Sequence, residues 1–261
     1  MQVVFTDLDG TLIDFHDYSY DKSEAALRRL KENSIPVIFN TGKTPAENFY
    51  YREKLGIADP FITENGSAIY IPEGYFDFEF DYSLRKDGFL VIELGAGYGR
   101  IISALNSINS AEGWSIRGRS AMSVDEVARD AGMPAELARL ARMREYSESF
   151  RFGGDTGKLS EAAAGFSMKI IHGGKYLNLV GEGADKGRAA LRLLELYRKI
   201  YPGIRSVGIG DSSNDIPLLK VVDLPVLVSS ERVSFPGARL TGAEGPEGFS
   251  EAVERFILPG S

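Results

Sequence analysis

The chain has 261 residues, 43% of them hydrophobic and 26% charged, which is the composition of a globular protein with one large core or two modest ones. Its net charge of -7 argues against nonspecific nucleic-acid binding. No long apolar run and no leader peptide can be recognised, which argues against a membrane partner and predicts a cytoplasmic location. Because there are no cysteines and only two histidines, thiolate catalysis is excluded and any metal is expected on oxygen ligands.

The first predicted strand is a β-branched, apolar run over residues 2–6, and it ends in Asp7-Leu8-Asp9-Gly10-Thr11. Asp7 and Asp9 are two residues apart, so on an extended backbone their side chains would share a face. Two like charges that close need a cation or a shared proton, and Mg²⁺ prefers carboxylate oxygens. A turn with two solvated aspartates is the alternative, since Asp and Gly are common turn formers.

Three strands in the first third of the chain each end in a polar loop, and helices separate them. The strands are predicted at 2–6, 35–40 and 61–63, and the helices at 24–32 and 45–55. Thr41-Gly42-Lys43 follows the second strand beside a helix N-terminus, and Glu64-Asn65-Gly66 follows the third. This alternation predicts an α/β fold, a doubly wound and mostly parallel sheet with its site at the strand ends.

The pattern changes after residue 82 and returns near residue 182. Between these points strands are predicted at 89–94, 114–116 and 144–150, helices at 98–108, 123–130, 134–142 and 158–164, and a β-hairpin over 166–179. This segment predicts an α+β domain, residues 83–181, inserted into a core formed by residues 1–82 and 182–261.

The last third contains a second acidic turn of the same design as the first. Asp185 is predicted to cap a helix through residue 197, which puts Lys186 in its first turn; a cation there is favoured by an anion in front of it. A strand at 206–209 then ends in Gly210-Asp211-Ser212-Ser213-Asn214-Asp215. A helix starting at 216, a strand at 223–228 and a helix at 247–258 complete the prediction.

Four of these stretches, Asp7 to Thr11, Thr41, Asp185-Lys186-Gly187 and Gly210 to Asp215, resemble the ordered motifs of the haloacid dehalogenase superfamily of phosphotransferases. The insert resembles the α/β cap of the Cof-type subgroup. The resemblance implies a Rossmann-like core, a nucleophile at Asp7 that forms an aspartyl-phosphate, and an acid/base at Asp9. It also implies that Thr41 and Lys186 hold the phosphoryl oxygens and that Mg²⁺ is bound by Asp7, Asp9 through its main-chain carbonyl, Asp211 and Asp215.

Within that subgroup, five stretches resemble the mannosyl-3-phosphoglycerate phosphatases: 41–44, 64–66, 144–148, 172–176 and 183–187. The implied partner is a small phosphorylated glycoside. The residues expected to bind it are Gly42, Lys43, Glu64, Asn65, Arg144, Glu148, Lys175 and Asn214. Asn178 and Leu179 follow the hairpin where the family is expected to have a histidine, and Asn40-Thr41-Gly42 is a loose version of the second motif. The sugar could therefore also be glucosyl or a disaccharide.

Several alternatives stay open at this point. Lys43 and Lys186 could be solvated lysines, Glu64-Asn65-Gly66 a plain turn, and Arg144 could pair with Glu148 across a strand. The enzyme could be a sucrose-phosphate or general sugar-phosphate phosphatase of the same subgroup. A Mg²⁺-dependent module that binds phospho-ligands without catalysis is the alternative from another class, although such a module needs no acid two residues from a nucleophile. The sequence leaves the oligomeric state open.

Overall fold

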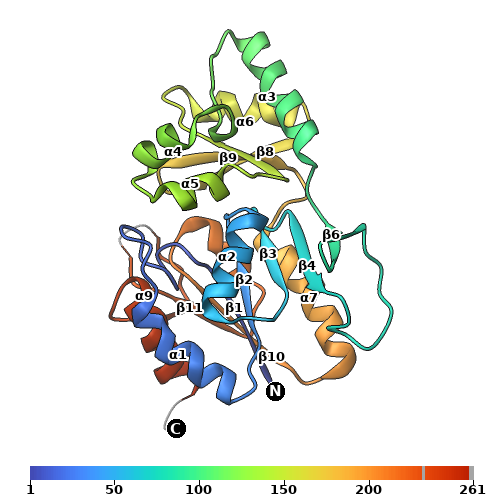
Figure 1. Cartoon of the computed structure of the whole chain (residues 1–261), viewed down its shortest axis with the longest axis vertical. Coiled ribbons are helices and arrows are strands. Elements are labelled where there is room, and N and C mark those ends of the chain that lie inside the picture. The colour runs from blue at the N-terminus through green and yellow to red at the C-terminus, as the bar shows by residue number, and fades with distance from the viewer. Residues whose placement is uncertain (231–232, 259–261) are drawn as a thin grey trace.

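The computed structural model describes residues 1–230 and 233–258, and in this part of the chain two lobes are visible (Figure 1). The larger lobe is built on a nine-stranded sheet with the order β12-β11-β10-β1-β2-β3-β4-β6-β5, and the smaller lobe on a three-stranded sheet with the order β7-β9-β8. The six strands from β12 to β3 are parallel, and β4, β6 and β5 continue the sheet antiparallel. The predicted α/β class and mostly parallel sheet are confirmed.

The elements of the larger lobe have the following bounds. The strands are β1 (Gln2–Thr6), β2 (Val37–Asn40), β3 (Phe61–Thr63), β4 (Ala68–Pro72), β5 (Leu84–Lys86), β6 (Phe89–Glu93), β10 (Arg205–Gly210), β11 (Leu224–Leu227) and β12 (Arg239–Leu240). The helices are α1 (Asp21–Glu32), α2 (Pro45–Leu55), α7 (Lys186–Ile200), η2 (Ser213–Asp215), α8 (Ile216–Leu219), α9 (Gly245–Ala252) and η3 (Val253–Ile257).

The smaller lobe contains the rest. Its strands are β7 (Ser147–Phe150), β8 (Met168–Gly173) and β9 (Tyr176–Gly181), and its helices are α3 (Tyr98–Glu112), η1 (Arg119–Ala121), α4 (Val124–Ala131), α5 (Ala135–Ala141) and α6 (Thr156–Ala164). In Figure 1, α3 and α6 lie on the outer side of this lobe, and α4 and α5 lie between its sheet and the larger lobe.

The central strand β1 is buried on both faces, which is why it reads as a continuous apolar run rather than an alternating one. Val3 and Phe5 point to one face and pack with Leu193 of α7. Val4 points to the other face and packs with Leu30 of α1. Helices on both faces leave only the ends of the strands open, and the loops after β1, β2, β3 and β10 all reach the side that faces the smaller lobe.

Three predicted elements differ from the structure because backbone groups find other partners. No strand forms at 114–116, because the Asn109 side chain bonds both the N–H and the carbonyl of Ile116, at 2.9 and 3.0 Å. The strand predicted at 144–150 begins only at Ser147, since the N–H groups before it turn to a carboxylate of the larger lobe. The last predicted helix, 247–258, becomes α9 followed by a turn of π-helix, η3.

The strands β5 and β6 belong to the large sheet, although residues 83–93 were expected in the insert. β6 pairs with β4 along five residues, from Ala68↔Glu93 to Pro72↔Phe89. We therefore propose that the insert runs from residue 94 to 181, so that the boundary does not separate β6 from β4. No helix in the described part of the chain combines the length and the apolar character needed to span a membrane.

Candidate active site

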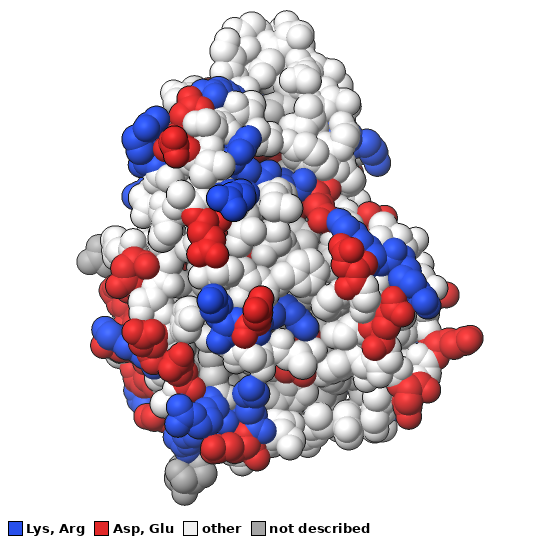
Figure 2. Space-filling view, in the orientation of Figure 1, with Lys and Arg blue, Asp and Glu red and all other residues white. Residues whose placement is uncertain are grey.

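A cavity of about 280 Å³ lies between the two lobes. The larger lobe contributes the loops that follow β1, β2, β3 and β10, and the smaller lobe contributes η1, the α4–α5 turn and the β8–β9 hairpin. On the face shown in Figure 2, Lys and Arg side chains gather near the junction of the lobes, although the chain as a whole is acidic. The cavity is therefore suited to a ligand that carries negative charge.

Three buried carboxylates and one lysine form a cluster at the strand ends. Asp7 follows β1, Asp211 follows β10 and Asp215 ends η2, and each offers an oxygen within 4.8 Å of the other two. The ammonium of Lys186 lies 2.8 Å from Asp7 Oδ1 and 2.6 Å from Asp215 Oδ1. The alternative of a solvated Lys186 is wrong, because only 1% of this residue is exposed.

The start of α7 is held where Lys186 can reach this cluster. Asp185 caps the helix by accepting a hydrogen bond from Arg188 N, as the sequence predicted. The turn after β3 packs directly on this helix start: Gly66 has φ +83°, and a Cβ there would lie 2.2 Å from the Asp185 carbonyl. A side chain cannot fit, so glycine at this position allows the close approach of β3 and α7.

The charges of the cluster leave room for a cation. Three carboxylates and one ammonium sum to a formal charge of −2 in a buried place, and burial raises the pKa of the Asp7 carboxyl to about 7, with Lys186 opposing the rise and Asp215 adding to it. Burial acts to lower the pKa of Lys186, but the effect of Asp215 and Asp7 is larger, so the pKa is raised overall and Lys186 stays protonated. Because the donors are all oxygens, the cluster could hold a hard metal ion.

The Asp9 side chain lies apart from this cluster, on the wall of the cavity. Its Oδ1 is 2.8 Å from the Nζ of Lys43, which is also 3.3 Å from Glu47 Oε1. Lys43 is 5% exposed, so the alternative of a solvated lysine is wrong here as well. Thr44 and Glu47 form the capping box that starts α2 and fixes this loop. Of the predicted metal ligands, Asp9 is the one whose carboxylate is not in the cluster.

Six other predicted residues line the cavity: Thr41, Gly42, Asn65, Arg144, Lys175 and Asn214. Asn214 Nδ2 donates to Asn65 Oδ1 at 3.1 Å, which joins the turns after β3 and β10. The Nδ2 of Asn65 is buried and has no hydrogen-bond acceptor in the part of the chain that the structure describes. These two amides are placed to meet a polar ligand.

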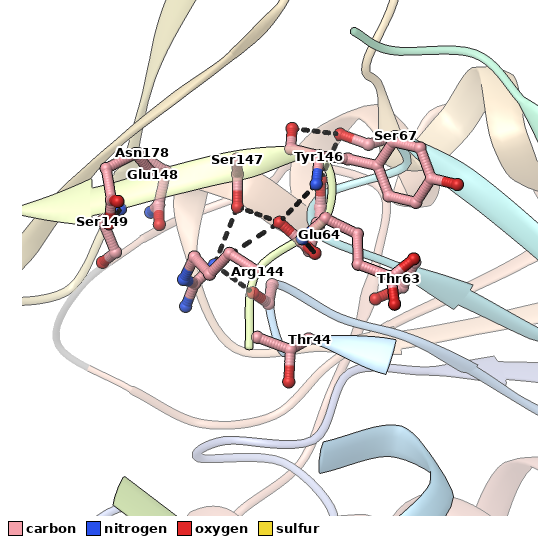
Figure 3. Close-up of polar contacts among 12 residues, drawn as sticks. Thr44, Thr63, Glu64, Ser67, Arg144, Tyr146, Ser147, Glu148, Ser149 and Asn178 are labelled. Carbon is pink, nitrogen blue, oxygen red and sulfur yellow. Dashed lines mark hydrogen bonds and ion pairs between the residues drawn. The ribbon is translucent and has the colours of Figure 1, made fainter. Parts of the chain in front are cut away.

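Glu64 was predicted to bind substrate, but the structure places it in a contact between the lobes (Figure 3). Its carboxylate accepts hydrogen bonds from Glu145 N at 2.8 Å, from Tyr146 N at 3.1 Å and from the Ser147 hydroxyl. It is fully buried and is not part of the cavity wall, and burial raises its pKa to about 7. The Glu64 carboxylate is therefore engaged by three donors of the chain and not by a ligand. The chain before β7 needs these acceptors because its buried N–H groups would otherwise have no partner.

Arg144 has partners on both lobes. Its Nη1 donates to Ser147 Oγ at 2.8 Å and to the Gly42 carbonyl at 3.3 Å, and it lies 3.9 Å from Glu64 Oε2. The alternative in which Arg144 pairs with Glu148 is therefore wrong. Arg144 also lines the cavity, and its Nε is buried without an acceptor in the part of the chain that the structure describes, so only part of its hydrogen-bonding capacity is used inside the protein.

Glu148 was also predicted to contact substrate, and the structure buries it within the smaller lobe instead. It accepts hydrogen bonds from the Tyr98 hydroxyl at 2.8 Å, from Ser149 N at 2.9 Å and from the Ser120 hydroxyl. These bonds connect η1 and α3 to β7, and they give the buried Ser149 N–H its acceptor.

Sequence reasoning missed several residues of the cavity wall, among them Tyr18, Arg119, Met133 and Tyr176. Tyr176 belongs to a stretch that carried the resemblance, so that motif could have indicated it. Arg119 lies in an irregular segment with no motif or periodicity, and only the packing of η1 on the hairpin brings it to the cavity.

Comparisons with known proteins agree with this geometry. The chain matches the family of haloacid dehalogenase-like hydrolases over residues 4–83 and 158–233. It is 39% identical to a glucosyl-3-phosphoglycerate/mannosyl-3-phosphoglycerate phosphatase of Methanococcoides burtonii, over 98% of this chain and 97% of the relative. It is 38% identical to a mannosyl-3-phosphoglycerate phosphatase of Pyrococcus horikoshii, over 88% and 91% respectively. A solved structure from Thermoplasma acidophilum superposes with a TM-score of 0.72 over 99% of both chains at 19% identity, a likeness of fold alone.

Proposed function

The chain belongs to the haloacid dehalogenase-like hydrolases, and we propose that it is a Mg²⁺-dependent phosphatase that releases phosphate from mannosyl-3-phosphoglycerate or a close glycosyl-3-phosphoglycerate. The observation that carries the proposal is the division of labour between two carboxylates of one turn. Asp7 is buried against Lys186 in the acidic cluster, whereas Asp9 projects from the same turn onto the cavity wall. One is placed to attack and the other to transfer a proton.

In the first step an oxygen of Asp7 attacks phosphorus, and the bond from phosphorus to the glycerate oxygen breaks. Asp9 gives its proton to that oxygen, so the products are an aspartyl-phosphate on Asp7 and the free glycosylglycerate. In the second step Asp9 takes a proton from a water molecule that attacks phosphorus, which releases phosphate and restores Asp7. Lys43, 2.8 Å from Asp9, keeps that carboxyl directed into the cavity.

In this proposal Lys186 and Thr41 interact with the phosphoryl group. Lys186 holds Asp7 by a charge-assisted hydrogen bond of 2.8 Å and brings a fixed positive charge to the end of β1. Thr41 is 1% exposed and lines the cavity after β2. Mg²⁺ would be held by Asp7, Asp211 and Asp215, and when bound it offsets the repulsion between Asp7 and the phosphate.

A phosphate-release assay tests this function. It compares mannosyl- and glucosyl-3-phosphoglycerate with sucrose 6-phosphate and p-nitrophenyl phosphate, each with Mg²⁺ or with excess chelator. We expect the highest kcat/KM on the two phosphoglycerate glycosides, and loss of turnover both in chelator and in Asp7→Asn. Higher kcat/KM on sucrose 6-phosphate would refute the substrate class, and full activity in chelator would refute the metal requirement.

A further inference from the structure

Arg119 is a buried cation on the cavity wall to which no role has been assigned. It begins η1, is 8% exposed, and has its guanidinium carbon 3.9 Å from the centre of the Tyr176 ring. Its Nε is buried without an acceptor, and in residues 1–230 and 233–258 no carboxylate forms an ion pair with it. An unpaired buried guanidinium is unfavourable unless a ligand supplies the missing anion.

The other cations around the cavity already have partners or lie in solvent. Lys43 is paired with Asp9 and Glu47, and Lys186 with Asp7 and Asp215. Arg144 is engaged by Ser147, the Gly42 carbonyl and Glu64. Lys175 is exposed on the hairpin turn. Arg144 keeps a buried Nε without an acceptor, but Arg119 is the buried cation of the described cavity wall whose side chain has neither an ion pair nor a hydrogen bond.

The surroundings of Arg119 hold it rigidly in place. The Tyr176 ring beneath it is fixed because its hydroxyl donates to Asp130 Oδ2 at 2.7 Å. The backbone before it is fixed by Gly118, which pairs with Phe150; a Cβ on Gly118 would lie 2.3 Å from Glu148. Glu148 accepts from the Ser120 hydroxyl on the other side. A guanidinium held in this way loses little freedom when it binds a carboxylate.

We propose that Arg119 binds the carboxylate of the glycerate part of the substrate and so determines selectivity for phosphoglycerate esters over phosphate esters without a carboxylate. This inference rests on the proposed function. The phosphate of such a substrate is directed to the acidic cluster, so its carboxylate needs a second cation, and a planar guanidinium can bind it through two parallel hydrogen bonds. In this proposal Arg119 is the residue that binds the carboxylate, and not Arg144 or Lys175, which the sequence suggested as substrate-binding residues.

The test compares mannosyl-3-phosphoglycerate with its analogue in which a hydroxymethyl group replaces the carboxylate. Arg119→Gln should lower kcat/KM for the acid about 10²-fold, chiefly through KM, and for the analogue by less than about fivefold. Arg119→Lys should recover part of the loss, because it restores the charge but not the fork. The matched control is Arg117→Gln: Arg117 is exposed, pairs with Glu126 and is not on the cavity wall, so both substrates should be unaffected.

Equal losses on the two substrates would overturn the proposal, because Arg119 would then act on the phosphoryl group or on the fold. A second measurement does not depend on the glycosyl group: inhibition of p-nitrophenyl phosphate hydrolysis by 3-phosphoglycerate and by glycerol 3-phosphate. Arg119→Gln should raise the inhibition constant of 3-phosphoglycerate far more than that of glycerol 3-phosphate. If the wild type does not hydrolyse the glycoside but this difference is found, the proposed function fails and the role of Arg119 stands. If 3-phosphoglycerate and glycerol 3-phosphate have equal inhibition constants for the wild type, the role proposed for Arg119 is refuted.

Discussion

Replacement of Lys186 by methionine should lower the free energy of unfolding by about 3–5 kcal/mol at pH 8 in the absence of metal. Methionine keeps most of the buried stem but removes the ammonium, and with it two ionic hydrogen bonds of 2.8 and 2.6 Å, each contributing about 1.5–3 kcal/mol. Asp7 and Asp215 would then face each other unpaired in a buried place. The two bonds together correspond to about 3–6 kcal/mol, and breaking a buried ion pair typically costs about 3–5 kcal/mol, so the two estimates overlap.

The loss should depend on pH. The pKa of Asp7 is already raised from 3.8 to about 7, so in the wild type this group favours the folded state at low pH and that contribution is lost as pH rises through about 7. Lys186 opposes the rise in the pKa of Asp7, so without Lys186 that pKa rises further. The stability of the variant therefore continues to fall with pH above the point at which that of the wild type levels off. The difference between wild type and Lys186→Met should therefore be larger at pH 8 than at pH 5.

Urea unfolding followed by the fluorescence of Trp114, the single tryptophan, at pH 5 and pH 8 with chelator measures both quantities. Removing a second carboxylate in Lys186→Met/Asp215→Asn should recover part of the stability. Lys199→Met, an exposed lysine of the same helix, is the control and should change stability by less than about 1 kcal/mol. A loss below about 1 kcal/mol for Lys186→Met, equal at both pH values, would refute the account of the cluster.

Three further predictions concern the turns around the site. Gly66→Ala should lower the free energy of unfolding in urea by more than about 2 kcal/mol. Gly74 also has a positive φ but open space around it, so Gly74→Ala should lower that free energy by only about 1 kcal/mol. Equal losses in the two variants would contradict the close contact of Gly66 with α7. The pKa of Glu64 is raised from 4.5 to about 7, so its contribution to stability is lost as pH rises through 7. The stability of the wild type relative to Glu64→Gln should therefore fall between about pH 4.5 and pH 8. A difference that stays constant over this interval would count against the burial of Glu64. Asp211→Asn should raise the Mg²⁺ concentration for half-maximal activity at least about tenfold, and an unchanged Mg²⁺ titration would remove Asp211 from the metal site.

The sequence by itself determined the core of this protein. Strands that end in Asp7 and Asp211 and a helix that begins at Lys186 can be recognised locally, because strand runs, caps and acidic turns are properties of a few consecutive residues. Once the parallel order is predicted, the carboxyl ends of the strands must meet at one edge, so the cluster follows from the motifs. The family that these motifs suggested is also the one that the comparisons found.

Only the tertiary structure decided which of the predicted substrate-binding residues face the cavity. Glu64, Arg144 and Glu148 look alike in sequence as polar residues of family-like stretches. All three are buried in contacts within and between the lobes, and of the three only Arg144 lines the cavity. Arg119 carries no local signal, and its place depends on a hairpin more than fifty residues further along the chain. A charged side chain in an irregular segment takes its role from the partner it meets, and that partner is set by long-range packing, which local sequence patterns do not contain.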